Sequence, residues 1–126
     1  MKKLTKAEEE IMLILWRLRE ALVRDIIREL ENPETPYTTV STIIRILEKK
    51  GFVSHKAYGN THLYFPLVSK REYSRSQIKD FVGNYFNGSF SGMATFFAKE
   101  SDMSIEELNE IMNELSKELE KKKKDG

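Results

Sequence analysis

The chain has 126 residues, 40% of them hydrophobic and 33% charged, with a formal net charge of +1. This allows one compact domain, or a small domain with an appended oligomerisation element, and excludes a disordered or fibrous chain. Since the sequence has no cysteine and no apolar run near the ~18–20 residues that span a bilayer, disulfides, thiolate chemistry and membrane insertion are excluded, and we expect a cytoplasmic protein.

Two helices are predicted at the N-terminal end. Thr5 and Glu8 have the spacing of a capping box, which satisfies free backbone donors at a helix start, so a helix should run from there to about Arg19. A shorter amphipathic helix fits residues 23–31. The proline-containing segment 32–36 ends it, because proline lacks an amide proton and disfavours a helical conformation in the residue before it.

The third predicted helix has one apolar stripe, formed at positions i, i+3, i+4 and i+7 by Val40, Ile43, Ile44 and Leu47. On the same helical wheel, the opposite face is hydroxylated and basic. It is centred on Thr38, Thr42, Arg45 and Lys49, with Ser41 and Ile46 at its edges.

That second face suits the major groove of DNA, where small hydroxyl residues allow close approach to base edges and cations reach guanine or phosphate. An ordinary solvated helix face has the same composition, so the helix alone leaves both interpretations open. The surrounding charge favours DNA. Residues 35–70 contain one acid, Glu48, and the basic residues Arg45, Lys49, Lys50, Lys56 and Lys70.

A β-hairpin is predicted directly after the third helix. Gly51 supplies a helix stop. Two short segments follow, residues 52–56 and 61–65, which are rich in aromatic and β-branched side chains in an alternating pattern and are joined by a connection at residues 57–60. Three helices followed by a hairpin are the order of a winged helix-turn-helix, in which the hairpin flanks the recognition helix against the DNA backbone. We therefore predict a DNA-binding domain over residues 1–72.

Three amphipathic helices are predicted in residues 73–126, over residues 75–86, residues 91–100 and from Ser104 onward, where Glu107 completes a capping box. They lack enough chain for a core of their own, so we expect a helical dimerisation region. Folding back on the first domain as a monomer is the alternative. The predicted interface residues are Phe81, Tyr85, Phe86, Phe96, Phe97, Leu108, Ile111, Met112 and Leu115.

The sequence offers little for catalysis. His55 and His62 lie in the predicted hairpin without a cluster of carboxylate ligands, so strand histidines that touch DNA phosphate are favoured over a metal site. There is no phosphate-binding glycine loop and no nucleophile elbow. We predict no enzyme activity, no metal and no cofactor.

A winged-helix adaptor that binds protein instead of DNA is the alternative function. An adaptor would not need a polar face of the third helix that is free of acidic residues, so the charge pattern favours DNA binding.

The sequence resembles the penicillinase-repressor (BlaI/MecI) family over nearly its whole length, and the resemblance lies in the order and spacing of several short motifs. These are Leu4-Thr5-Lys6-Ala7-Glu8, residues 11–16, Thr39-Val40-Ser41-Thr42, Leu47-Glu48-Lys49-Lys50-Gly51, the hairpin residues Lys56, Gly59, Tyr64, Phe65 and Pro66, and residues 87–90 and 103–108. The resemblance implies a mostly α fold with a small β-hairpin wing, and a homodimeric repressor that binds a palindromic double-stranded operator.

By position, the resemblance implies that Thr39 and Thr42 contact DNA. Thr38 stands where family members often have lysine. Asn60 occupies a place usually held by a wing arginine, so we expect one contact of the wing with a phosphate or the minor groove to be weaker. Taken together, the predicted DNA-binding residues are Thr38, Thr39, Ser41, Thr42, Arg45, Lys49, Lys56 and Asn60.

The resemblance also implies inactivation when a membrane sensor triggers proteolysis of the repressor. The family's cleavage point, between an asparagine and a phenylalanine, falls at Phe96-Phe97, where the phenylalanine is kept and the asparagine is not. Copper-responsive relatives use a C-terminal cysteine cluster. This chain has no cysteine, so it cannot sense copper by that route.

Overall fold

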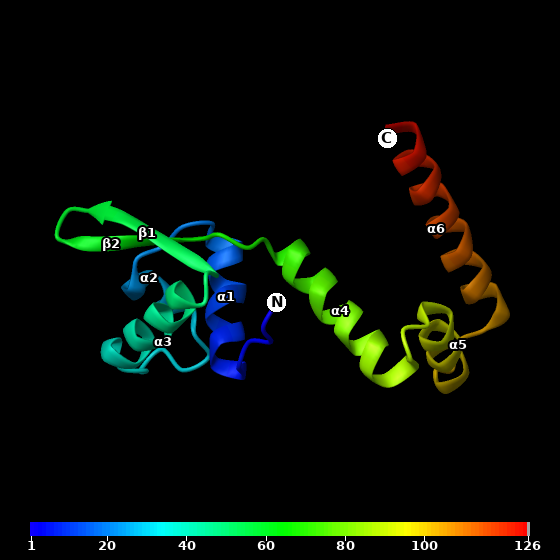
Figure 1. The fold of residues 1–126 in the computed structure, drawn as a ribbon, viewed down its shortest axis with the longest axis horizontal. Helices are drawn as coiled ribbons and strands as arrows, with labels where there is room; N and C mark the ends of the chain where they lie inside the picture. The colour runs from blue at the N-terminus through cyan, green and yellow to red at the C-terminus, as the bar shows by residue number, and fades with distance from the viewer. Residues whose placement is uncertain (126) are drawn as a thin grey trace. The chain divides into compact units, whose positions relative to one another are not determined.

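The computed structural model describes residues 1–125, and the contacts between residues divide the chain into two units, Met1–Ile78 and Lys79–Gly126. The division falls later than the predicted boundary after residue 72. Gly126, which ends the predicted dimerisation region, lies outside the described residues. The elements in chain order (Figure 1) are α1 (Lys6–Leu18), α2 (Val23–Glu29), α3 (Tyr37–Lys49), β1 (Val53–Tyr58), β2 (Thr61–Pro66), α4 (Lys70–Phe86), α5 (Phe90–Glu100) and α6 (Ile105–Asp125).

This element order confirms the predicted fold class, a mostly α chain with a small hairpin after the third helix. None of the helices in the described part of the chain is long and apolar enough to cross a membrane.

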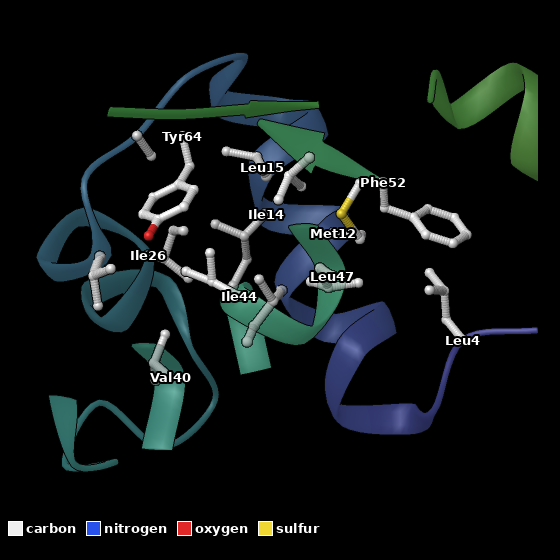
Figure 2. Packing of buried hydrophobic residues seen from close by; sticks show 14 of the residues in the cluster. Leu4, Met12, Ile14, Leu15, Ile26, Val40, Ile44, Leu47, Phe52 and Tyr64 are labelled. Carbon is white, nitrogen blue, oxygen red and sulfur yellow. The ribbon is translucent and has the colours of Figure 1, made fainter. Parts of the chain in front are cut away.

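The N-terminal unit encloses one hydrophobic core between α1, α2, α3 and the hairpin (Figure 2). Met12 and Leu15 of α1 meet Ile44 and Leu47 of α3, and all four side chains are fully buried. Burying apolar area contributes roughly 25 cal/mol per Å², so this cluster is the main source of stability for the unit. The cluster consists of Leu4, Ile11, Met12, Ile14, Leu15, Ala21, Val23, Ile26, Val40, Ile44, Leu47, Phe52, Val53, Tyr64 and Tyr73.

The helix ends follow the local signals in the sequence. At the start of α1, the Thr5 hydroxyl accepts from the Glu8 backbone N–H at 3.2 Å, and the Glu8 carboxylate accepts from the Thr5 N–H at 2.8 Å, which confirms the predicted capping box. At the end of α3, Gly51 has φ of +84° and its N–H donates to the Glu48 carbonyl, while the Phe52 N–H donates to the Leu47 carbonyl. These two bonds form a Schellman motif, which turns the chain directly into β1.

The hairpin is antiparallel and longer than predicted. Its pairs run from Val53 opposite Pro66 to Tyr58 opposite Thr61, so the connection contains two residues, Gly59 and Asn60, instead of the predicted four. A two-residue connection needs a positive φ that matches the strand twist, and Gly59 supplies it at +61°. Ala57 and Tyr58, predicted to lie in the connection, are paired in the ladder with His62 and Thr61.

A second attachment holds the hairpin against the helices. Ala21, between α1 and α2, exchanges two backbone hydrogen bonds of 2.9 Å with Tyr64 of β2. Since Ala21 follows α1 directly, the hairpin is fixed relative to the helical core from both strands.

α4 begins at Lys70, earlier than the predicted start at residue 75. Ser69 and Glu72 form a capping box in which the Ser69 hydroxyl accepts from the Glu72 N–H at 3.0 Å and the carboxylate accepts from the Ser69 N–H at 3.3 Å. This motif is visible in the sequence but was not recognised. One residue later, Tyr73 enters the core of the N-terminal unit and accepts a hydrogen bond from the Leu4 N–H at 2.9 Å.

The C-terminal unit keeps most of its large apolar side chains exposed. Val82 is its one buried hydrophobic residue among those that the structure describes. Asn87 and Gly88 both have positive φ and end α4 as predicted, and the Ser104 hydroxyl accepts from the Glu107 N–H at 3.1 Å at the start of α6. The helices therefore form as the sequence predicts, while their apolar faces stay uncovered in a single chain.

Candidate nucleic-acid interface

The exposed face of α3 has the composition that the helical wheel predicted. Val40, Ile44 and Leu47 are buried, and Ile43 is partly buried, so the apolar stripe points into the N-terminal unit. The opposite face is open to solvent and displays Thr38, Thr39, Thr42, Arg45 and Lys49. The Thr42 hydroxyl donates to the Thr38 carbonyl at 2.8 Å, which leaves its lone pairs available as acceptors.

Ser41 does not belong to this exposed face. Its side chain is turned toward the hairpin, and the residue is 9% exposed. The wheel placed Ser41 at the edge of the polar face. That edge borders the groove between α3 and the hairpin, so Ser41 is more buried than the other polar residues of α3.

A groove of about 340 Å³ separates α3 from the hairpin. It is lined by Val23 of α2, by Tyr37, Ser41, Arg45 and Glu48 of α3, and by His55, Asn60, Thr61, His62 and Tyr64 of the hairpin. His55 pairs with Tyr64 and Ala57 pairs with His62 in the ladder, so these side chains share one hairpin face, the face toward α3. The groove therefore joins predicted DNA-binding residues from both elements, Arg45 and Asn60, with the two histidines.

Lys56 lies on the other face of the hairpin, because its position alternates with that of His55. Its ammonium group is 3.2 Å from the Glu20 carboxylate, and both side chains are largely exposed. Exposed pairs of this kind are worth little, so Lys56 can exchange Glu20 for another anion at small cost.

Lys50 does not contribute to the basic surface that the charge count indicated. Its ammonium group contacts both Glu8 carboxylate oxygens, at 2.7 and 3.0 Å, and the side chains of Lys50 and Glu8 are 26% and 5% exposed. Burial acts to raise the pKa of the Glu8 carboxyl, but the hydrogen bonds from Lys50 and Thr5 outweigh it, and the pKa lies below its ordinary value of 4.5. Lys50 thus ties the end of α3 to the start of α1.

The groove also holds a close contact between a carboxylate and a histidine. The Glu48 carboxylate is 2.6 Å from Nδ1 of His55, whose ring stacks on His62 with centroids 4.1 Å apart and planes 7° from parallel. Sequence reasoning weighed both histidines but left them out of the DNA-binding set. Strand alternation, counted from the buried Tyr64, could have placed them on the face toward α3.

Tyr64 forms the buried wall of the groove. Burial raises the pKa of its hydroxyl above the ordinary value, the Glu48 carboxylate acts in the same direction, and Arg45 acts against them. Tyr64 is therefore neutral at physiological pH.

Two exposed tyrosines, one in α3 and one on the outer face of the hairpin, are absent from the predicted DNA-binding residues. Tyr37, in the first turn of α3, is 53% exposed, and Tyr58, beside the hairpin tip, is 58% exposed. Phenolic hydroxyls donate to phosphate oxygens in protein–DNA contacts. In the sequence, only position marks these two tyrosines: Tyr37 comes immediately before the hydroxyl residues of α3, and Tyr58 comes immediately before the glycine of the hairpin turn.

The described residues contain no group of three or more His, Cys, Asp or Glu side chains that could hold a metal ion. The arrangement consists of an exposed hydroxyl and cationic helix face beside a polar groove, and such a surface can contact a polyanion.

The predicted dimerisation residues lie at or near the surface of the C-terminal helices. Phe81, Tyr85, Phe96, Phe97, Ile111, Met112 and Leu115 are exposed, and Phe86 and Leu108 are partly buried. Phe86 contacts Phe81 and Phe96, with ring centroids 5.8 and 5.6 Å apart. Phe96 and Phe97, the predicted cleavage position, lie within the helical α5.

Comparison with known proteins gives consistent matches over the chain. A family model described as penicillinase repressor matches residues 4–117. The methicillin resistance regulatory protein MecI of Staphylococcus aureus strain N315 is 29% identical over 116 residues, which cover 91% of this chain and 94% of that protein. The penicillinase repressor of Bacillus licheniformis is 28% identical over 123 residues, which cover 96% and 95%. Among solved structures, the DNA-binding domain of the repressor BlaI is 30% identical with a TM-score of 0.49, and the match covers 58% of this chain and 94% of that one.

Proposed function

The chain belongs to the penicillinase-repressor family, and from this premise we propose that it is a transcriptional repressor that binds operator DNA through α3 and the hairpin. The family is one of repressors and not of enzymes. The observation that carries the proposal is the orientation of α3: its aliphatic stripe is buried, and its hydroxyl and cationic face, centred on Thr42 and Arg45, is open to solvent.

In the proposed complex, α3 enters the major groove. Thr38, Thr39 and Thr42 approach base edges, while Arg45 and Lys49 reach guanine or phosphate. The hairpin lies against the sugar–phosphate backbone, with Asn60 at its tip and Lys56 on its outer face. Ser41 lines the groove between α3 and the hairpin, so its proposed contact with DNA lies in that groove.

Binding can be measured with the purified full chain and duplex fragments that carry palindromes from upstream of its own gene. Arg45→Ala is expected to weaken binding by about tenfold or more, because a good side-chain contact to a base is worth ~1–3 kcal/mol. Arg75→Ala, an exposed arginine on α4, is the matched control and should change affinity little. Equal affinities of the Arg45 and Arg75 variants would contradict the assignment of α3.

Salt dependence separates DNA binding from a protein-adaptor function. Cations that neutralise phosphates release condensed counterions, so the logarithm of affinity should fall linearly with the logarithm of salt concentration. Removing Lys49 should reduce the slope by about one per chain. A complex that is insensitive to salt, or no complex with any fragment, would favour the adaptor.

We further propose that the repressor acts as a homodimer on a palindromic site. The exposed apolar residues of α5 and α6 need a covering surface, and a second copy of the chain provides one through two-fold symmetry. Two chains then present two α3 helices to two half-sites.

The dimer is tested by sedimentation of the full chain and two variants of α6. Leu115→Glu places a charge among the exposed apolar residues and should produce a monomer, with operator affinity reduced about 100-fold or more because the two half-site contacts are no longer linked. Lys117→Glu introduces a glutamate on the opposite side of α6 and should leave the dimer intact. A dimeric Leu115→Glu variant would move the interface elsewhere.

Relief of repression by a sensor-triggered signal completes the proposal, with cleavage between Phe96 and Phe97 as its site. Both rings are exposed, but the backbone is helical, so α5 must unwind locally before a protease can bind it. Co-expression with membrane sensor proteases of relatives, followed by intact mass measurement, should yield a fragment that ends at Phe96. A chain that stays intact while repression is relieved would exclude this site.

A further inference from the structure

The groove between α3 and the hairpin contains both histidines of the chain. The sequence has no cysteine, and histidine is the side chain whose ordinary titration falls between pH 5 and 8. The side chains that ordinarily change charge near neutral pH are therefore concentrated at the surface where α3 and the hairpin meet.

The contacts of His55 with Glu48 and His62 determine which of its ring nitrogens can take up a proton. The Glu48 carboxylate 2.6 Å from Nδ1 of His55 accepts hydrogen bonds only, so Nδ1 carries a proton and acidification adds the second one at Nε2. The His62 ring lies parallel to the His55 ring with centroids 4.1 Å apart. Two positive charges at that spacing would repel each other, and an anion bound beside the two rings would offset that repulsion.

The other charged and titratable groups of the groove come from α3 and β2. Arg45 adds positive charge, Glu48 adds negative charge, and the hydroxyl of Tyr64, whose pKa burial raises, is neutral near pH 7. α2 contributes only the apolar Val23 among the lining residues. With Arg45 and a protonated pair facing one carboxylate, the groove has an excess of positive charge that a bound anion would compensate.

We propose that this groove seats a phosphate of the DNA backbone and that seating the phosphate is coupled to proton uptake by the His55–His62 pair. The proposal rests on the proposed function, and it adds a ligand group and a proton linkage to it. A phosphate favours the charged form of a histidine beside it, so the complex holds more protons than the free protein. DNA affinity must then rise as the pH falls.

The experiment measures the affinity of the full chain for its palindromic duplex between pH 5.5 and 7.0 at constant ionic strength. In this range the α-amino group and lysines stay charged, so their contacts add no slope. Affinity should rise by several-fold toward pH 5.5, with a limit of about tenfold per pH unit for each groove that takes up one proton. A duplex of unrelated sequence should show the same trend, because phosphate contacts carry no sequence information.

His55→Gln combined with His62→Gln removes the linkage while keeping polar side chains in the groove. This double variant should bind DNA with an affinity that is independent of pH over the range. Lys56→Gln, on the other hairpin face, is the control: it removes a cation and lowers the salt slope but should keep the pH dependence. Circular dichroism at each pH establishes that the variants are folded.

Glu48→Gln is expected to raise the affinity for DNA, not to lower it. Without the carboxylate, the groove repels phosphate less, so affinity at pH 7.0 should rise. DNA binding with the same pH slope in the wild type and the double histidine variant would overturn the inference and leave the repressor function standing. Absence of DNA binding at every pH would instead overturn the proposed function.

Discussion

The two units of this protein are both built largely from amphipathic helices, but they place their apolar side chains differently. In the N-terminal unit, α1, α2, α3 and the hairpin approach one another from several directions and close a core around Leu15 and Ile44. In residues 79–125, the helices form with good capping signals, yet Phe97, Met112 and Leu115 stay exposed. Helix formation is local, whereas a closed core needs a second surface, and the C-terminal helices require that surface from outside the unit.

The largest expected difference in the free energy of unfolding is between the replacement of a core leucine and the replacement of an exposed one. Leu15→Ala leaves a cavity in the N-terminal unit and should lower the free energy of unfolding by about 2–5 kcal/mol. Leu115→Ala should change that free energy by less than about 0.5 kcal/mol in a monomer and weaken association of the chains instead. Urea titrations at several protein concentrations distinguish the two. Equal losses that do not depend on concentration would mean that α6 belongs to a closed core.

The ion pair between Lys50 and Glu8 should have the next largest effect. Lys50→Met leaves the Glu8 carboxylate buried beside an apolar side chain and should cost about 2–3 kcal/mol, less than a fully buried pair, because Lys50 is partly exposed. The exposed pair of Lys121 and Glu118 in α6 is the comparison, and Lys121→Met should cost almost nothing.

The same pair gives a pH dependence of known sign. The pKa of Glu8 is lowered in the folded state, so its contribution to stability is present above about pH 4.5 and is lost as the pH falls through the lowered folded-state value. Urea midpoints of the wild type should fall on acidification more steeply than those of Glu8→Gln. Parallel curves for the two proteins would show that Glu8 is not a linked group.

Tyr73 tests where the N-terminal unit ends. Tyr73→Phe keeps the ring among the core residues but removes the oxygen that accepts from the Leu4 N–H, and leaving that donor unpaired should cost about 1–2 kcal/mol. Tyr85→Phe, an exposed tyrosine later on α4, should be neutral. If both changes were neutral, the first turn of α4 would not be part of the winged unit.

The smallest expected effect compares two helix starts. Ser69→Ala removes the hydroxyl that caps α4 beside the closed core, and the loss should be about 1 kcal/mol in the stability of the N-terminal unit. Ser104→Ala removes the equivalent bond at the start of α6 and should instead lower the helix content of the C-terminal unit, seen by circular dichroism. An identical response to both changes would mean that the units unfold together.

Local signals in the sequence were sufficient for much of the fold. The capping box of Thr5 and Glu8, the inward stripe of α3 and the helix stops at Gly51 and Gly88 depend on residues within a few positions of one another. The start of α4 was equally local, since Ser69 and Glu72 form the same kind of capping box, although the predicted helix began only at residue 75.

The sequence by itself determined which helices form, which face of α3 is polar and that a hairpin follows, because periodicity and capping act over one or two helical turns. Only the tertiary structure decided that Lys50 pairs with Glu8, that Tyr73 reaches Leu4 and that Ser41 lines a groove beside the hairpin. It also brought Glu48 of α3 beside the two hairpin histidines. These contacts depend on how complete elements pack against one another, and the free energy that selects that packing comes from the whole core and not from any one segment.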